Sequence, residues 1–314
     1  MPNPFPYSSD NKRYHTLARY FRQEFGGRVF KVPLDIGSTC PNRDGTKGIG
    51  GCTYCIDGGV GSFPGYGIGS LSDQFYRGVE RIRRKWPVGR AIVYFQSASN
   101  TYMPPEHLRS RVEEALTFPG VCGVSIATRA DVLPGGILDY LEELSRRVWL
   151  CVELGLQTVH DNTARRINRC HDYAEFLSGY QALRCRGIRT CVHLMNGLPG
   201  ERRDDMLQTA LQIGRLYPHS VKFHMLYLLR GSAMAAECSG GNFPLLSGEE
   251  YISILCEQLE LLPPETVIQR ITGDPPLEGL IAPCWITNKL WVRNALDLEM
   301  SRRDTTQGAR FIPG

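Results

Sequence analysis

Short apolar segments alternate with longer amphipathic segments along most of the chain. The short segments are rich in β-branched and aromatic residues, which is typical of strands. They predict strands at Val29–Asp35, Ala91–Gln96, Val121–Thr128, Val148–Leu154, Thr190–Met195 and Val221–Leu226. The longer segments have helical periodicity and predict helices at Leu71–Trp86, Pro105–Leu116, Gly136–Arg146, Tyr173–Arg186 and Arg202–Leu216.

This alternation predicts an α/β fold in which helices cover the outer face of a parallel sheet. Eight strand–helix units would close a full barrel, so the shorter series predicts a partial (βα)6 TIM-like barrel. A doubly wound sheet is the competing topology. In either fold the chemistry gathers at the carboxyl ends of the strands. Polar clusters follow four of the predicted strands, at Gln96–Asn100, Thr128–Asp131, Glu153–Gln157 and Asn196–Glu201.

The pattern becomes less regular after about Leu228. Gly248–Leu262 predicts a helix, Thr266–Ile271 predicts a further strand, and roughly the last dozen residues are polar and expected to fray. We expect residues 1–230 to form the core with an N-terminal lead-in, and residues 231–314 to form a C-terminal extension packed on it.

Composition and charge change this picture little. The chain has 314 residues and a net charge of +4. Its apolar runs are too short to cross a bilayer, and its first residues lack the apolar core of a signal peptide, so we expect a cytoplasmic protein with no membrane partner. A basic cluster at Arg81, Arg83, Arg84, Lys85 and Arg90 could contact phosphates, although such clusters are more often solvated helix faces.

Three of the eleven cysteines are clustered. Cys40, Cys52 and Cys55 lie in the segment CPNRDGTKGIGGCTYC, directly after the first predicted strand. Three thiolates are one short of a closed zinc site, whereas a [4Fe–4S] cluster held by three cysteines leaves one iron open. A zinc site with a remote fourth ligand stays an alternative. The other eight are predicted to be small buried hydrophobes: Cys122, Cys151, Cys170, Cys185, Cys191, Cys238, Cys256 and Cys284.

These motifs, with several others, resemble the radical SAM superfamily, and more closely the bacterial subgroup related to the catalytic subunit of Elongator. The resemblance extends from about Arg19 to about Arg293 and includes YFQSASNTY, IATRADVLP, ELGLQT, RINRCHD, HLMNGLPGE, KFHMLYLLRGSAM and LIAPCW. The long spacing between Cys40 and Cys52 departs from the usual superfamily motif and is characteristic of the subgroup. Ala130 stands where subgroup members usually have proline.

The resemblance implies a [4Fe–4S] cluster, bound by the three clustered cysteines, that binds and reductively cleaves S-adenosylmethionine. The product, a 5′-deoxyadenosyl radical, abstracts a hydrogen atom from the substrate, while the protein supplies binding and orientation. The implied cofactor contacts are Tyr54 at the adenine, Gln96 and Asn100 at the methionine amino group, Glu153 at the ribose, Gln157 at the ribose or the methionine carboxylate, Arg169 at the methionine carboxylate, and the segment that begins at Asn196 at the nucleoside.

The roles of three side chains, Glu153, His193 and His224, depend on how deeply each side chain is buried. Glu153 would be costly in a strand without a polar partner, so a partner is expected. His193 and His224 alternate with apolar neighbours, where a histidine is more often a satisfied core residue. If either acts, substrate binding or proton transfer is the expected role.

The resemblance implies a substrate class only by analogy. Because the catalytic subunit of Elongator and several relatives act on wobble uridines, one hypothesis is modification of a tRNA wobble uridine side chain, with tRNA as a partner. The alternatives are a radical SAM enzyme for a protein or small metabolite, and a non-enzymatic metal-binding module. The enzymatic hypotheses require an electron donor such as flavodoxin or ferredoxin.

Overall fold

The computed structural model describes residues 5, 7, 12–56, 69–239 and 244–313. The strands are β1 Val29–Leu34, β2 Arg90–Phe95, β3 Val121–Thr128, β4 Trp149–Gln157, β5 Arg189–Asn196, β6 Ser220–Met225, β7 Leu228–Leu229, β8 Val267–Arg270 and β9 Leu280–Ala282. The helices are α1 Leu17–Phe25, α2 Leu71–Arg83, α3 Pro105–Leu116, α4 Gly135–Arg147, α5 Asp161–Arg166, α6 Tyr173–Cys185, α7 Arg203–Gly214, α8 Ala233–Ser239, α9 Gly248–Glu260 and α10 Lys289–Arg302, with a 3-10 turn at Cys284–Thr287.

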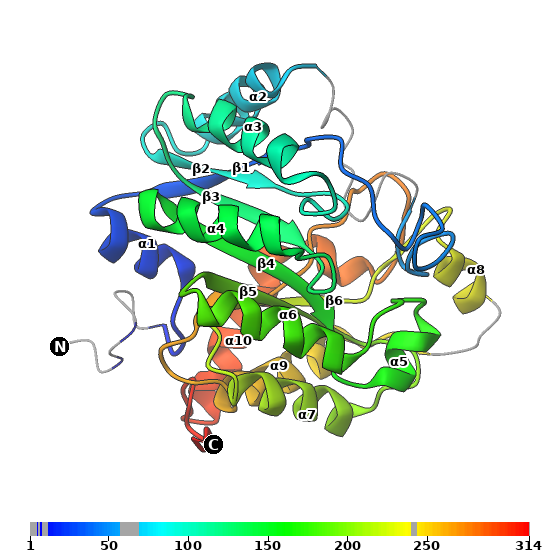
Figure 1. Cartoon of the computed structure of the whole chain (residues 1–314). Coiled ribbons are helices and arrows are strands. Elements are labelled where there is room, and N and C mark those ends of the chain that lie inside the picture. The colour runs from blue at the N-terminus through cyan, green and yellow to red at the C-terminus, as the bar shows by residue number, and fades with distance from the viewer. Residues whose placement is uncertain (1–4, 6, 8–11, 57–68, 240–243, 314) are drawn as a thin grey trace.

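The main sheet is a parallel half-barrel with the strand order β1-β2-β3-β4-β5-β6-β8. The order follows the chain without reversal, so the doubly wound alternative is wrong and the barrel-like prediction is confirmed (Figure 1). The predicted count of six core strands is one short. Val267–Arg270, expected as a further strand of the C-terminal extension, pairs with β6 and lengthens the same sheet.

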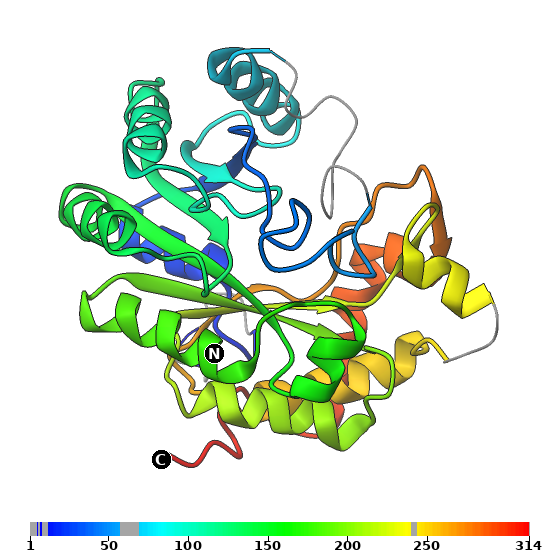
Figure 2. The same cartoon turned by 45° about the vertical axis from the view of Figure 1, so that its right-hand side comes forward.

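The two faces of the sheet carry different chemistry because successive side chains point to opposite sides. On β4, Val152 and Leu154 belong to the main apolar core, which also contains Leu141 of α4 and Phe176 of α6. Glu153, between those two core residues, faces the concave side. Figure 2 shows residues 35–56, which follow β1, on this concave side, away from α3, α4 and α6.

Helix α1 closes the amino end of the concave side. Phe21 is buried and lies edge-on to Trp149, the first residue of β4, with 5.6 Å between ring centroids. The two rings share an apolar cluster with Ile92, Cys151 and Cys191. The interior of the half-barrel is therefore filled at the amino ends of the strands and leaves space toward their carboxyl ends.

The C-terminal segment is anchored, so the expectation that it frays is wrong for most of its length. Gln307 is buried, and its Nε2 donates to the carbonyl oxygens of Pro263 (2.7 Å) and Thr266 (2.8 Å). Its backbone N–H donates to the carbonyl of Arg13 at 2.8 Å. Beside it, the N–H of Ile268 in β8 donates to the carbonyl of His15 at 2.8 Å. The domain boundary near residue 231 stays a prediction.

The scattered cysteines differ in burial, and Cys122, Cys170 and Cys238 are partly buried. Cys151, Cys191 and Cys256 are buried, as expected of small hydrophobes, but Cys185 and Cys284 are exposed, so the expectation is wrong for those two. No helix among the described residues is long and apolar enough to span a bilayer.

Candidate active site

A cavity of about 470 Å³ occupies the concave side at the carboxyl ends of the strands. Cys40, Cys52 and Cys55 all line it, together with Tyr54. Three of the four polar clusters predicted at strand ends also contribute to its wall, through residues such as Gln96, Arg129 and Gln157. The structure therefore brings together segments far apart in the sequence around the cysteine loop.

The cysteine loop is held by turns of its own backbone. The carbonyl of Cys40 accepts from the N–H of Arg43 (2.8 Å), and the carbonyl of Cys52 accepts from the N–H of Cys55 (2.9 Å). Gly48 is tightly enclosed, because a Cβ at this position would lie 2.2 Å from Asn42 Oδ1 and 2.6 Å from Cys170 Sγ. A side chain at Gly48 would therefore displace the loop.

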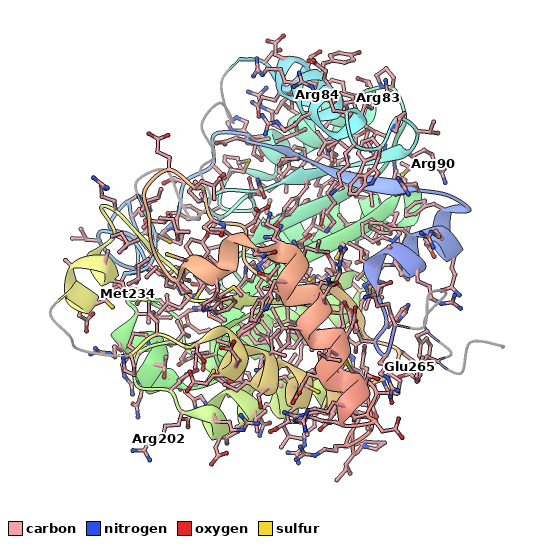
Figure 3. All side chains as sticks on the ribbon, turned by 180° about the vertical axis from the view of Figure 1, so that it is seen from behind. Arg83, Arg84, Arg90, Arg202, Met234 and Glu265 are labelled. Atoms are coloured by element: carbon pink, nitrogen blue, oxygen red, sulfur yellow. The ribbon has the colours of Figure 1, made fainter. Side chains whose placement is uncertain are left out.

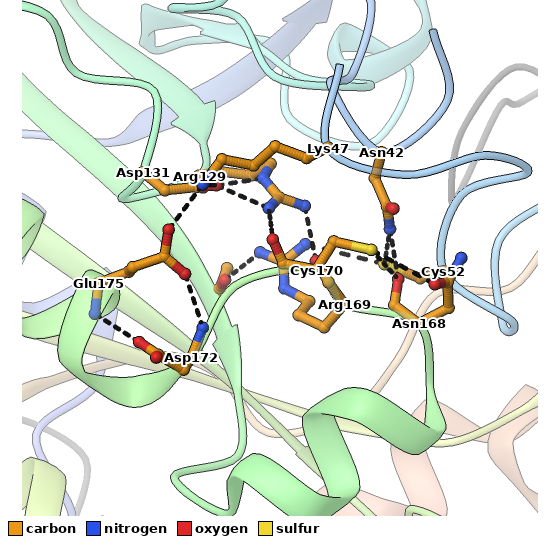
Figure 4. A network of polar contacts seen from close by, with 11 residues as sticks. Asn42, Lys47, Cys52, Arg129, Asp131, Asn168, Arg169, Cys170, Asp172 and Glu175 are labelled. Carbon is orange, nitrogen blue, oxygen red and sulfur yellow. Dashed lines mark hydrogen bonds and ion pairs between the residues drawn. The ribbon is translucent and has the colours of Figure 1, made fainter. Parts of the chain in front are cut away.

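The loop is also fastened to the segment between α5 and α6 (Figure 4). Asn42 Nδ2 donates to the carbonyl of Asn168, and it lies 3.6 Å from Cys52 Sγ. Asn168 Nδ2 returns a hydrogen bond to the carbonyl of Gly51 at 2.8 Å. These two asparagines fix Cys52 relative to the segment between α5 and α6.

A buried arginine–carboxylate pair supports that segment from the side of β3. Arg129 binds Asp131 through two hydrogen bonds of 2.9 and 2.8 Å, and its Nη1 donates to the carbonyl of Arg169 at 2.8 Å. Lys47 of the cysteine loop completes the connection, at 2.7 Å from Asp131. Burial would raise the pKa of Asp131, but Arg129 and Lys47 outweigh it and hold this pKa well below its usual value.

Arg169 places a positive charge beside the cysteines. Its Nη1 lies 3.8 Å from Cys52 Sγ, and its Nη2 donates to the carbonyl of Gly155. A hydrogen bond from the Cys55 thiol and the charge of Arg169 lower the pKa of Cys52 well below the usual range, despite its burial. A cysteine whose thiolate is favoured in this way is suited to metal ligation.

Gln157 combines backbone strain with an unpaired polar atom. Its φ of 78° lies in the left-handed region, which non-glycine residues seldom adopt. Its Oε1 is buried and has no hydrogen-bond partner among the described residues. Ser97 and Ala98, also on the cavity wall, have φ of 74° and 51°. Strain and unsatisfied polar groups cluster at binding sites.

Two predicted cofactor contacts lie outside the cavity wall. Asn100 is fully buried, and its Nδ2 donates to the carbonyls of Ser97 (3.0 Å) and Ala127 (2.8 Å). Asn196 forms a reciprocal amide pair with Gln258 of α9, with hydrogen bonds of 2.8 and 2.9 Å. Both side chains support loops, and the structure does not bring them together with Tyr54, Gln96, Gln157 and Arg169, which line the cavity.

Glu153 forms the floor of the cavity. The expected polar partners are present: its carboxylate binds Lys31 at 2.5 Å, His193 at 2.8 Å, Ser125 and Lys222. The position predicted for it, at the end of β4, is wrong. It precedes Gln157, the last residue of β4, by four positions, which is roughly 13 Å along a strand. Because its oxygens are already occupied, the structure does not support a ribose contact.

The floor holds one positive charge in excess. Burial would raise the pKa of Glu153, but Lys222 and Lys31 hold it well below the usual value, so it is a carboxylate between two ammonium groups. Burial lowers the pKa of His193 to about 4 and that of His224 well below its usual value, which leaves both rings neutral. Burial also raises the pKa of Tyr94 well above 10, so its hydroxyl carries no charge.

Lys31, Tyr94 and Lys222 were not predicted from the sequence. A lysine between apolar neighbours in a strand, as in VFKVPL and SVKFHM, is the signal that could have found the two cations, because buried lysines are rare unless paired. The floor is a poor metal site. Although ligand atoms of Glu153, Cys191 and His193 lie within 4.8 Å of one another, the two ammonium groups already neutralise the carboxylate.

The sequence matches the radical SAM superfamily over residues 36–213 and the radical SAM C-terminal domain over residues 218–302. It is 47% identical over 309 residues to the uncharacterised protein YtqA of Bacillus subtilis, covering 98% of this chain and 96% of that protein. It is 23% identical to mouse Elongator complex protein 3 over 278 residues, covering 76% of this chain and half (50%) of that protein. The structure of Methanocaldococcus infernus Elp3 superimposes with a TM-score of 0.62 at 15% identity, covering 89% of this chain and 64% of that chain.

The cavity with three cysteines at its wall defines a metal-cofactor site at the carboxyl end of a half-barrel. The chain belongs to the radical SAM superfamily, and the predicted family and fold are confirmed. The cofactors of this class are a [4Fe–4S] cluster and S-adenosylmethionine. The residues present fit both: three thiols share one cavity wall, and an unpartnered amide oxygen lies on the same wall.

Proposed function

We propose that this protein is a radical SAM enzyme whose cluster is bound by Cys40, Cys52 and Cys55, and that it modifies the side chain of a tRNA wobble uridine. When bound, the reduced cluster supplies the electron that cleaves the sulfonium bond of S-adenosylmethionine to give a 5′-deoxyadenosyl radical. The observation that carries the first part is the convergence of the three cysteines on one strained, polar cavity. An electron donor such as flavodoxin or ferredoxin would reduce the cluster.

The side chains that line the cavity have distinct roles in this proposal. Tyr54 and Gln157 contact the nucleoside, Gln157 through the amide oxygen that has no partner among the described residues. Gln96 accepts from the methionine amino group, which an amide oxygen does without adding charge. Arg169, already beside Cys52, faces the methionine carboxylate. The asparagines at 100 and 196 orient loops.

The tRNA substrate rests on the relationship to Elongator complex protein 3. The chain spans about half (50%) of the mouse protein. Its matches to the radical SAM family models lead us to propose that it carries out a radical SAM step on the tRNA. A C5 side chain on uridine presents a carbon whose hydrogen a radical can abstract.

A second candidate, a small metabolite or protein substrate, is favoured by the position of the basic cluster. Arg90 is the first residue of β2, and Arg83 ends α2, so both lie at the amino ends of the strands. Figure 3 shows Arg83, Arg84 and Arg90 together, away from Met234, whose N–H donates to Thr53 of the cysteine loop. Phosphates bound by this cluster would not lie at the cavity mouth.

Replacing any of the three cysteines by alanine tests the cofactor proposal. After anaerobic reconstitution and reduction, each variant is expected to form no 5′-deoxyadenosine from S-adenosylmethionine, because three thiolates are needed to hold the cluster. Cys185→Ala is the control, since this exposed thiol on α6 is remote from the loop in sequence and does not line the cavity. Uptake of zinc in place of an iron–sulfur cluster by the wild-type protein would contradict the proposal.

Mass-spectrometric profiling of tRNA nucleosides tests the substrate. Cells that lack the protein are expected to accumulate a precursor of one modified wobble uridine, and the wild-type chain, but not Cys52→Ala, is expected to restore the product. Unchanged nucleosides would leave the radical SAM assignment intact and favour the metabolite or protein substrate.

A further inference from the structure

The floor of the cavity has hydrogen-bonding capacity that the described protein groups do not use. Lys222 Nζ contacts Glu153 and the Tyr94 hydroxyl (3.3 Å), which leaves one of its three N–H donors for a group in the cavity. His224 Nε2 is buried and has no partner among the described residues. Both side chains line the cavity and lie on one face of β6, two residues apart.

The partners of Lys31 show that this spare capacity is specific to one side of the floor. Lys31 Nζ donates to Glu153, Gln269 (2.7 Å) and Ser125 (3.2 Å), so its three donors are satisfied. Lys222 is therefore the lysine whose positive charge is available to a ligand. Arg270, a further cation on the cavity wall, lies 4.0 Å from the carboxylate of Asp274, which Lys289 also binds.

An unbalanced buried cation is costly unless an anion accompanies it. The charged floor is not needed to fill the interior of the half-barrel, because the aromatic cluster of α1 fills the space beneath it. A charged group that stability does not need, facing an open cavity, is best explained by a ligand.

The number and position of the free donors indicate which anion is bound. Lys222 Nζ, together with His224 in the tautomer that carries its proton on Nε2, offers two donors, which match the two oxygens of a carboxylate. Phosphate sites are usually built from free backbone N–H groups of helix starts and glycine-rich loops, or from arginine forks. The floor side chains project from strands β1 to β6, where backbone groups are committed to the sheet.

We infer that the floor binds a carboxylate of the substrate, with Lys222 donating to one oxygen and His224 to the other. This inference rests on the proposed function, because it treats the cavity as the substrate chamber of a radical SAM enzyme. The cysteines line the same cavity, and their loop follows the carboxyl end of β1. A substrate anchored at the floor would present the carbons next to its carboxylate toward the cofactor. If the substrate is a wobble uridine, the inference requires a carboxylate on its C5 side chain.

Binding of acetate to the reconstituted holoenzyme saturated with S-adenosylmethionine tests this inference, with NMR of the acetate methyl group as the measurement. Lys222→Met and His224→Leu are expected to weaken acetate binding about tenfold or more, since each removes a buried hydrogen bond to a charged group. Lys85→Met, which removes an exposed lysine, is the control and is expected to leave binding unchanged. Acetamide, the neutral counterpart of acetate, is expected not to compete.

Three results would overturn the inference. Acetate could bind both floor variants as tightly as the wild type. Inorganic phosphate could bind through Lys222 more tightly than acetate. Saturating S-adenosylmethionine could displace acetate from the wild type, which would assign the floor to the cofactor. Failure of the tRNA proposal is separate: unchanged tRNA nucleosides together with Lys222-dependent acetate binding would retain the carboxylate site and reject the uridine.

Discussion

At the scale of single residues, Glu153 shows how one carboxylate can organise a buried polar layer. It contacts Lys31 and Lys222, and His193 also binds it as a neutral ring. A buried ion pair contributes little net stability, but removing one partner leaves the other uncompensated. Replacing the carboxylate and replacing one of the two lysines should therefore have very different effects on the free energy of unfolding.

Glu153→Gln is expected to lower the free energy of unfolding by about 3–5 kcal/mol, because two ammonium groups lose their counter-ion. Lys222→Met is expected to change it by less than about 1 kcal/mol, because Glu153 keeps Lys31 and the layer becomes neutral. Chemical denaturation of both variants and the wild type provides the comparison. Equal losses of unfolding free energy in the two variants would contradict an excess positive charge at the floor.

At the scale of elements, the close approach of α6 to the end of β3 positions the segment that carries Arg129. Gly179 of α6 faces the backbone of Ala130, and a Cβ at Gly179 would lie 2.1 Å from the carbonyl oxygen of Ala130. Helix and strand end can approach this closely only because residue 179 has no side chain. Arg129 and Asp131, which bind each other, flank Ala130 in the chain.

Gly179→Ala is expected to destabilise the protein by about 1–3 kcal/mol, because a backbone atom blocks the added methyl group. Gly135→Ala is the matched control. Gly135 begins α4, and a methyl group added there would meet no described atom within 4 Å, so this change should alter stability by less than about 1 kcal/mol. Thermal unfolding measures both, and a tolerated Gly179→Ala would argue against the close packing of α6.

At the scale of the whole molecule, the half-barrel is arranged in levels along the strands. The aromatic cluster of α1 fills the amino end, the layer around Glu153 lies above it, and the cysteine loop lies at the carboxyl end. His219 belongs to the sealed end, where its ring lies edge-on to Tyr20 with 5.0 Å between centroids. Burial, followed by the charge of Arg189, lowers the pKa of His219 to about 3.

The stability of the molecule should therefore fall on acidification. The unfolded chain protonates His219 near pH 6.5 and the folded chain only near pH 3, so the unfolded state binds more protons between these values. The contribution is fully present above pH 6.5 and is lost as the pH falls toward 3. His219→Phe should make the decline shallower by up to about 1.4 kcal/mol per pH unit. Denaturation series at several pH values measure the slope, and an unchanged slope would contradict this assignment.

Features that depend on neighbouring positions in the chain, such as strands, helices and the cysteine loop, could be predicted from the sequence. The alternation of strands and helices predicted a barrel-like sheet, and the cysteine spacing predicted which loop faces the site. Glu153 was assigned to a strand end because periodicity does not mark the last residue of a strand. The charged floor was missed because Lys31, Glu153 and Lys222 are brought together only by the sheet. Asn100 and Asn196 resembled ligands because polarity alone does not reveal that a neighbouring backbone or Gln258 already occupies an amide.

The edge formed by β1 has a consequence for self-association. Among the described strands β1 pairs only with β2, whereas the outer side of β8 is covered by the segment around His15. The carbonyl of Leu34 accepts from Gln96, so the backbone groups of the preceding residue, Pro33, point outward. Proline has no N–H to offer there, so a strand from a second molecule could not complete a hydrogen-bonded ladder along β1. One proline thus protects an open half-barrel from edge-to-edge aggregation.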